Sequence, residues 1–211
     1  MKISIKLWSK LAWVLIACVV AIWWNFPQKN VNEVQGTVLK HPRSVPSFNM
    51  TGMDGQVFNN QSLHGQWTML FFGFTHCSSV CPIRLMALAK MRILLEQQHV
   101  PMLPHVVMVS LDPERDAGPR LTSYVQAFNP SFYAAIGSTD TLSRLQHAWG
   151  ISSDKVMRRT AADTAMLPDI EHSSTVMVFN PAGELVAFLT GQALADQLAS
   201  DFLYISTTRN K

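Results

Sequence analysis

The 211-residue sequence predicts an α/β domain built in three layers, and three patterns support this prediction. Apolar runs with the length of buried strands, at residues 67–74 and 105–111, alternate with segments of helical periodicity. Two shorter apolar runs, at 175–179 and 184–189, flank the turn Asn-Pro-Ala-Gly and predict a hairpin. A helix from about 193 to 203 should follow this hairpin. A domain of about 160 residues can bury a core without the help of disulfides.

The first half of this domain follows from local signals. Residues 46–59 predict a small hairpin, because Gly-Met-Asp-Gly at 52–55 can form its turn. The run at 67–74 is apolar almost throughout, as expected of a strand buried on both faces. Pro82 favours the first turn of a helix that should extend to about Gln98. This helix should have an apolar side with Leu85, Leu88, Met91 and Leu95, and a water-facing side with Arg84, Lys90, Arg92 and Glu96.

The second half alternates in the same way. Residues 105–111 predict a second buried strand. A helix near 120–128, a short strand near 132–136 and a helix over 139–149 are expected next. Residues 152–171 are polar and predict an irregular segment.

The N-terminal residues predict a membrane anchor. Three lysines precede the charge-free run at 11–24, which ends on Trp23 and Trp24. Paired tryptophans suit a membrane interface, whereas a cleaved signal peptide needs small residues at its cleavage site. We therefore expect an uncleaved single-pass anchor over 1–27, a linker over 28–44 and the domain over 45–206. With the lysines inside, the anchor would lie in a bacterial inner membrane and the domain would face the periplasm.

Cys18 leaves an alternative open. The sequence Leu-Ile-Ala-Cys at 15–18 resembles a lipoprotein processing box, in which the cysteine becomes the lipidated N-terminus. Six apolar residues follow Cys18, whereas a lipidated cysteine usually closes the apolar run, so we favour a small hydrophobe inside an anchor. Either interpretation tethers the domain to a membrane in an oxidising compartment. The formal net charge of only +3, without a Lys/Arg run, argues against a nucleic-acid partner, and we expect a monomer.

Cys77 and Cys81 are separated by three residues, and Pro82 follows at once. A disulfide between them would close a loop of about five residues and contribute only about 2 kcal/mol, so the pair is expected to be reactive rather than structural. The amides that begin the following helix, together with Arg84 and His76, should favour thiolates. Thiolates bind soft metals such as Cu(I) and attack disulfides. A dithiol between a strand and a helix is the thioredoxin-like arrangement, and it lies where ligands gather in open α/β sheets.

A third ligand from imidazole would suit Cu(II) as well as Cu(I), and seven histidines are available. His172 stands immediately before the strand at 175–179, where thioredoxin-like folds approach the dithiol and normally carry a cis-proline. Ser173 and Ser174 occupy that place here, which favours metal over disulfide exchange. His76 could tune the thiolates or act as a ligand itself. The other histidines are expected at the surface or in caps, or for His105 in the core: His41, His64, His99, His105 and His147.

Taken together, three segments resemble the Sco/SenC copper-chaperone family: FFGFTHCSSVCP at 71–82, VSLDPERD at 109–116 and EHSSTVMVFNPAGEL at 171–185. The resemblance implies a thioredoxin-like copper protein whose ligands are Cys77, Cys81 and His172. It further implies a role in building the copper centre of cytochrome c oxidase, as copper donor, as thiol reductant, or as both. The implied partners are the copper-receiving oxidase subunit and a thiol reductant or copper-donor protein.

Two positions depart from the family pattern. Ser78 and Ser79 stand where relatives commonly have Pro-Asp, and Glu171 replaces the usual aspartate before the histidine. The first change removes a negative charge beside the thiolates, while Glu171 could orient the imidazole or face solvent. Asp112 and Asp116 fit the family, although DPERD could equally be a turn with a helix start.

Two other functions use the same cysteines. A thiol–disulfide oxidoreductase explains the dithiol but leaves His172 without a role. A peroxidase would place Thr75 two residues before a reactive cysteine, but it needs an arginine near the thiolate. Arg84 is the nearest arginine in sequence, and it should point away along its helix. The metallochaperone is therefore the preferred hypothesis.

Overall fold

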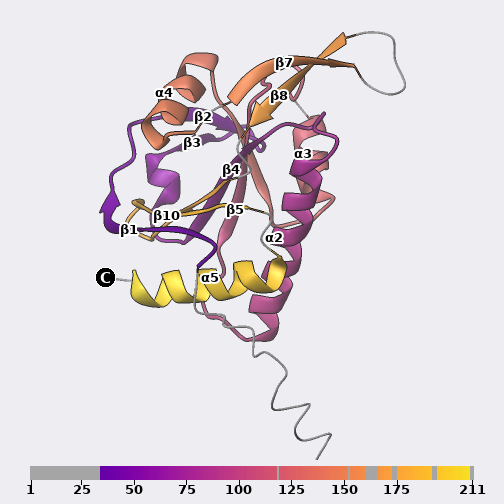
Figure 1. Ribbon diagram of the computed structural model, residues 1–211. Coiled ribbons are helices and arrows are strands. Elements are labelled where there is room, and N and C mark those ends of the chain that lie inside the picture. The colour runs from indigo at the N-terminus through magenta and orange to yellow at the C-terminus, as the bar shows by residue number, and fades with distance from the viewer. Residues whose placement is uncertain are drawn as a thin grey trace, which may run out of the picture. The chain divides into compact units, whose positions relative to one another are not determined.

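The computed structural model describes residues 34–117, 119–151, 153–159, 166–172, 175–191 and 194–209, with the backbone alone for 153–159 and 166–172 (Figure 1). The expected anchor and Cys18 lie outside these ranges. Within them, no helix combines the length and the apolar character needed to cross a membrane. Residues Val34–Lys211 form one compact unit, which begins eleven residues before the expected domain start at 45.

One mixed sheet of eight strands forms the centre of the described domain, in the order β1-β10-β9-β4-β5-β6-β2-β3. Its strands are β1 (Gly36–Arg43), β2 (Asn49–Gly52), β3 (Val57–Asn59), β4 (Thr68–Gly73), β5 (His105–Ser110), β6 (Tyr133–Ile136), β9 (Val176–Phe179) and β10 (Leu185–Leu189). β4, β5 and β6 run parallel, and the other neighbours are antiparallel. Every residue of β4 is buried, which confirms the strand predicted from the apolar run.

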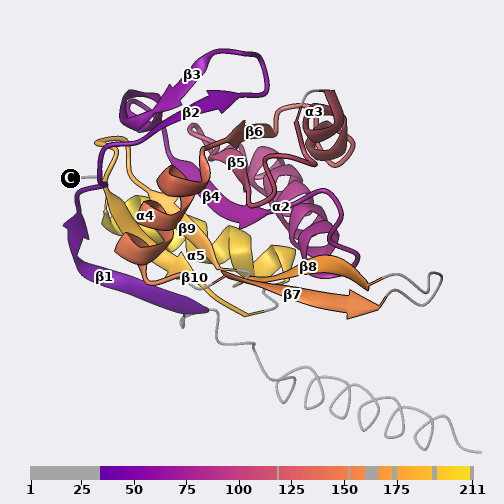
Figure 2. The same cartoon turned by 90° about the horizontal axis from the view of Figure 1, so that it is seen from above.

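Successive residues of β4 face opposite sides of the sheet, and a separate core lies on each side. Met69 and Phe71 pack with α2 (Val80–Gln97), α3 (Pro119–Gln126) and α5 (Ala195–Thr208). Leu70 and Phe72 pack with α4 (Thr139–Trp149), the hairpin β2–β3 and the short 3-10 helix η1 (Asn60–Leu63). The view from above shows the helices on both sides of the sheet (Figure 2). The predicted three-layer α/β architecture is confirmed.

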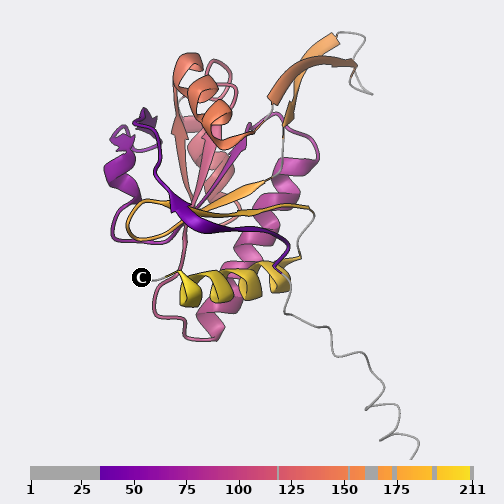
Figure 3. The same ribbon diagram turned by 60° about the vertical axis from the view of Figure 1, so that its left-hand side comes forward.

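Two segments differ from their predictions. Half of the expected linker is strand β1, which pairs with β10 at the edge of the sheet. The segment expected to be irregular forms an antiparallel hairpin of β7 (Ser153–Arg159) and β8 (Met166–His172), which projects from the main sheet (Figure 3). Both segments contain a proline, Pro42 or Pro168, and an edge strand tolerates a residue without an amide hydrogen. Neither segment has the continuous apolar run that reveals a central strand.

Candidate metal centre

The two cysteines lie where β4 ends and α2 begins, at the carboxyl edge of the parallel strands. Cys81 is fully buried in the first turn of α2, while Cys77 is partly exposed, and both are in the reduced form. The Cys81 amide donates a hydrogen bond to the Cys77 sulfur at 3.4 Å. Gly73 lies beneath the pair, because a Cβ there would stand 3.1 Å from the Cys81 sulfur. The helix start is thus packed directly on the end of the strand.

The two sulfurs are electrostatically unequal. The thiol of Cys81 hydrogen-bonds to Cys77, and together with burial and the negative charge of the Cys77 thiolate this holds the pKa of Cys81 far above its usual range. Cys77 receives a helix-start amide instead, as predicted, and is the more exposed of the two. Cys77 is therefore the sulfur that becomes a thiolate first.

Asp116 fixes the loop that leads into Cys77. Its carboxylate is fully buried and accepts hydrogen bonds from three groups: the Thr75 amide at 3.1 Å, the Thr75 hydroxyl at 2.6 Å and the Ser110 hydroxyl at 2.7 Å. Ser110 in turn accepts a bond from the Asp112 amide, and the Asp112 side chain pairs with Arg115. Within the segment at 112–116, the buried Asp116 therefore anchors the cysteine loop, a role beyond the turn or helix start that the sequence suggested.

The His76 side chain is also held. Arg120, on α3, donates from its guanidinium to His76 Nε2 at 2.7 Å. The other ring nitrogen, Nδ1, lies 3.3 Å from the Thr75 hydroxyl and 3.7 Å from Asp116. A pocket of about 440 Å³ opens beside the pair and is lined by Thr75, His76, Arg120, Ser123 and Tyr124. Both nitrogens of His76 are therefore engaged within the protein.

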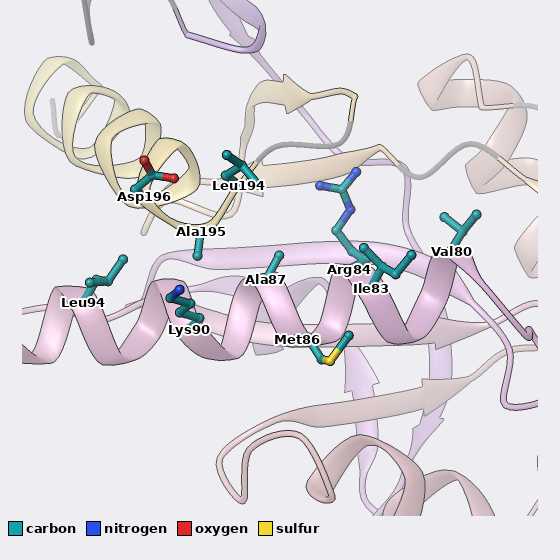
Figure 4. Close-up of a pocket in the computed structure, with 10 residues that line it drawn as sticks. All are labelled: Val80, Ile83, Arg84, Met86, Ala87, Lys90, Leu94, Leu194, Ala195 and Asp196. Carbon is teal, nitrogen blue, oxygen red and sulfur yellow. The ribbon is translucent and has the colours of Figure 1, made fainter. Parts of the chain in front are cut away.

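Arg84 contradicts its prediction as a water-facing residue that favours thiolate. It is 5% exposed, and its guanidinium donates to the carbonyl of Gly191 before α5. In Figure 4 the Arg84 side chain points away from the α2 axis, on the side where Leu194 lies. The helical period placed it away from the sheet core, but α5 packs on that side of α2 and buries it. A groove of about 670 Å³ runs along the same side of α2 between Val80 and Leu94 (Figure 4). Apolar side chains such as Ile83, Met86 and Leu194 line most of this groove, together with Arg84, Lys90 and Asp196.

His172 is the last residue of β8, where it pairs with Ser153, and its side chain lies outside the described part of the chain. The topology still places its backbone near the dithiol edge. β4 and β9 are antiparallel, with Leu70 opposite Met177. The chain beyond Leu70 and the chain before Met177 therefore lie at the same end of the sheet, and they contain Cys77 and His172. Glu171, which precedes His172 in β8, likewise has no described side chain.

The other histidines agree with their predictions. Those expected at the surface are exposed: His41, His64, His99 and His147. His105 at the start of β5 is partly buried, and its Nδ1 lies 3.4 Å from the Gln66 amide nitrogen. Burial, followed by the charge of Arg92, lowers the pKa of His105. Among the described side chains, no three His, Cys, Asp or Glu residues gather as a metal site. The described donors for copper are consequently the two sulfurs, a set that suits soft Cu(I).

Arg120 and the full role of Asp116 were missed from the sequence. They lie 44 and 41 residues from the groups that they contact, so no local spacing reveals them. Asp116 did carry a signal, because it belongs to one of the three family-like segments. Arg120 carried none.

The chain matches the family model described as SCO1/SenC over residues 37–205. It is 26% identical over 204 residues to "Protein SCO2 homolog, mitochondrial" of Danio rerio, covering 93% of this chain and 71% of that protein. It is 30% identical over 142 residues to "Protein SCO1 homolog 1, mitochondrial" of Arabidopsis thaliana, covering 67% of this chain and 40% of that protein. The chain thus spans less than half of this second relative.

Two solved structures share the fold. Arabidopsis thaliana ScoI with copper bound superposes with a TM-score of 0.68 at 25% identity, covering 78% of this chain and 98% of the other. Apo Sco1 from Thermus thermophilus superposes with a TM-score of 0.67 at 28% identity, covering 82% and 97%. The thioredoxin-like fold and the resemblance inferred from the three sequence segments are confirmed.

Proposed function

The chain belongs to the SCO1/SenC family, and we propose that it is a copper-binding metallochaperone for the copper centre of cytochrome c oxidase. The observation that carries this proposal is the reduced pair of Cys77 and Cys81 at the start of α2, with a helix amide donating to the Cys77 sulfur. The copper-bound ScoI structure of Arabidopsis supports the choice of metal. Cys77, Cys81 and His172 are the proposed ligands, and we propose Glu171 as the residue that orients the imidazole.

Copper is cargo in this proposal, and the two cysteines receive it in order. Cys77, as the first thiolate and the more exposed sulfur, makes the first bond. Cys81 must then lose the proton that its environment favours, because thiolate is the form that binds metal. His172 adds nitrogen ligation, which Cu(II) prefers more than Cu(I) does. The low coordination that two sulfurs alone offer to Cu(I) leaves the metal open to transfer.

The proposed setting is a bacterial inner membrane, with residues 1–27 as a single-pass anchor and the domain in the periplasm. The lysines before the apolar run and the two tryptophans at its end support this orientation. The proposed partners are the copper-receiving subunit of the oxidase and a thiol reductant or copper-donor protein. The domain acts as a monomer.

Thiol–disulfide exchange is the second candidate, and the unequal sulfurs favour it. In such enzymes the more exposed cysteine usually attacks and the buried one resolves, as the partly exposed Cys77 and the buried Cys81 could do here. If copper binding is the function, oxidation to the Cys77–Cys81 disulfide should abolish copper uptake and reduction should restore it. Equal uptake by the oxidised and reduced protein would refute copper binding through the two thiolates.

The decisive experiment adds Cu(I) or Cu(II) to the full chain in detergent and records stoichiometry and the visible thiolate–Cu(II) band. The Cys77→Ser and Cys81→Ser variants should each lose the binding of both Cu(I) and Cu(II). His172→Ala should keep Cu(I), which two soft sulfurs can hold, and lose most Cu(II) affinity together with the band. His147→Ala, which removes an exposed histidine of α4, is the matched control and should behave like the parent. If His172→Ala binds Cu(II) like the parent, His172 is not the third ligand.

A further inference from the structure

His76 is the imidazole nearest to the dithiol in sequence, and the structure connects it to three separate segments. Arg120 on α3 contacts its Nε2, and Thr75 in the cysteine loop contacts its Nδ1. Thr75 is bonded to Asp116, which follows β5 and also binds Ser110. The chain of contacts therefore runs from α3 through the cysteine loop to the loop after β5.

The direction of each hydrogen bond follows from the donors. A guanidinium can only donate, so His76 Nε2 must accept, and the ring proton must lie on Nδ1. Nδ1–H then donates to the Thr75 oxygen, whose own hydroxyl donates to Asp116 at 2.6 Å. Each group in this chain of hydrogen bonds thus has a defined donor or acceptor. The one lone pair that the His76 ring could offer to a metal already accepts the hydrogen bond from Arg120.

We propose that Arg120 is a positioning residue that keeps His76 out of the copper site, so that His172 is the single imidazole available to the metal. This inference rests on the proposed function. An imidazole–metal bond is about 2 Å long and uses the lone pair that now accepts from Arg120, so the two contacts exclude each other. With a second nitrogen beside Cys77, Cu(II) would bind more tightly and leave less readily for a partner. Arg120 therefore determines which ligand set, and which valence, the site prefers.

The position of the pair makes this exclusion necessary. The His76 side chain is 37% exposed and lines the open pocket of about 440 Å³, so burial does not protect it from a metal. Its backbone neighbour is Cys77, the sulfur that becomes a thiolate first. Thr75 holds Nδ1, and among the described side chains the contact that occupies the lone pair of Nε2 is the bond from Arg120.

A metal-free experiment tests the contact itself. Diethyl pyrocarbonate acylates the lone-pair nitrogen of neutral histidine, and mass spectrometry of the full chain in detergent reports the rate at His76. The Arg120→Ala variant should react at His76 at least tenfold faster than the parent. Arg144→Ala is the matched control, because it also removes one exposed arginine charge but pairs with Asp140 on α4, and it should react like the parent. An unchanged rate at His76 in Arg120→Ala overturns the inference.

A copper experiment tests the consequence. His172→Ala lacks the third ligand, and adding Arg120→Ala should release His76 and restore Cu(II) affinity at least tenfold, together with a thiolate–Cu(II) band. A further His76→Ala change should remove this gain. No gain in the double variant overturns the role in ligand exclusion, because a merely structural arginine would shift stability alone. A parent that takes up no copper at Cys77 and Cys81 refutes the proposed function and with it the exclusion, whereas the acylation rate still decides whether the contact protects His76.

Discussion

The dithiol loop and the β7–β8 hairpin supply the two halves of the proposed copper site, and the fold holds them in different ways. The loop is packed on Gly73, bonded to Asp116 and contacted by α3 through Arg120. The hairpin ends in His172, and within the described residues β7 and β8 pair only with each other. The sulfur half therefore belongs to the main sheet and its helices, while the histidine half lies on a separate two-stranded sheet. Changes in the first half should affect folding as well as copper, and changes in the second should affect copper alone.

The largest effect is expected from Asp116→Ala in the domain from residue 28 onward. It leaves the Thr75 amide, the Thr75 hydroxyl and the Ser110 hydroxyl without their buried acceptor. The free energy of unfolding should fall by about 3–4 kcal/mol, measured by urea denaturation. Asp116→Asn retains one acceptor oxygen and should lose about half as much. A loss below about 1 kcal/mol for Asp116→Ala would show that the loop is not held by this carboxylate.

The fold was predictable from the sequence where buried strands consist of continuous apolar runs. β4 and β5 are buried on both faces, so their apolar runs identified them, and the three-layer architecture followed from alternating strands and helices. β1 and the hairpin were missed because edge strands with a proline alternate weakly. Arg84 was misplaced because helical periodicity describes one helix at a time, and the position of α5 decides which of its sides is buried.

The site was predictable only in part. The sulfurs follow from their spacing and from the proline that starts α2, because both are local features. The contacts from Asp116 to Thr75 and from Arg120 to His76 join groups about 40 residues apart in sequence. Only the packing of α3 and of the loop after β5 brings these groups together. His172 was singled out by its place before β9, and its role stays a prediction that copper titration decides.

A smaller effect is expected from Gly73→Ala. The added Cβ would stand 3.1 Å from the Cys81 sulfur, the Met108 sulfur and a ring carbon of Phe71. Overpacking of this kind costs about 1–3 kcal/mol of unfolding free energy. Gly150→Ala tests a contrasting glycine, because its Cβ would meet no atom within 4 Å and only its left-handed φ of 67° would be strained. If Gly73→Ala binds Cu(I) and unfolds like the parent, α2 does not need its close approach to β4.

Alkylation rates can compare the two cysteines within the sulfur half of the site. Burial and the hydrogen bond to Cys77 raise the pKa of Cys81, so its thiolate fraction at neutral pH is lower than that of Cys77. Iodoacetamide should therefore modify Cys77 more than tenfold faster, with the sites mapped by mass spectrometry. Raising the pH within the neutral range should leave Cys81 slow, because its pKa lies far above its usual range. Comparable rates at the two sulfurs would contradict the assignment of Cys77 as the first thiolate.

The smallest effect on folding is expected from His172→Ala, and this makes it the sharpest test of the comparison. Within the described backbone, β8 pairs with β7 and with no strand of the main sheet. The free energy of unfolding without metal should change by less than about 0.5 kcal/mol, measured in the same urea series as Asp116→Ala.

In the presence of Cu(II) the parent should gain stability from the bound metal, whereas His172→Ala should gain little, since binding to the folded state alone raises its stability. The Cys77→Ser variant should also lose the stability gained from Cu(II). Cu(I) distinguishes the two variants, because it should stabilise His172→Ala but not Cys77→Ser. A large loss of metal-free stability in His172→Ala would show that the histidine half belongs to the core after all.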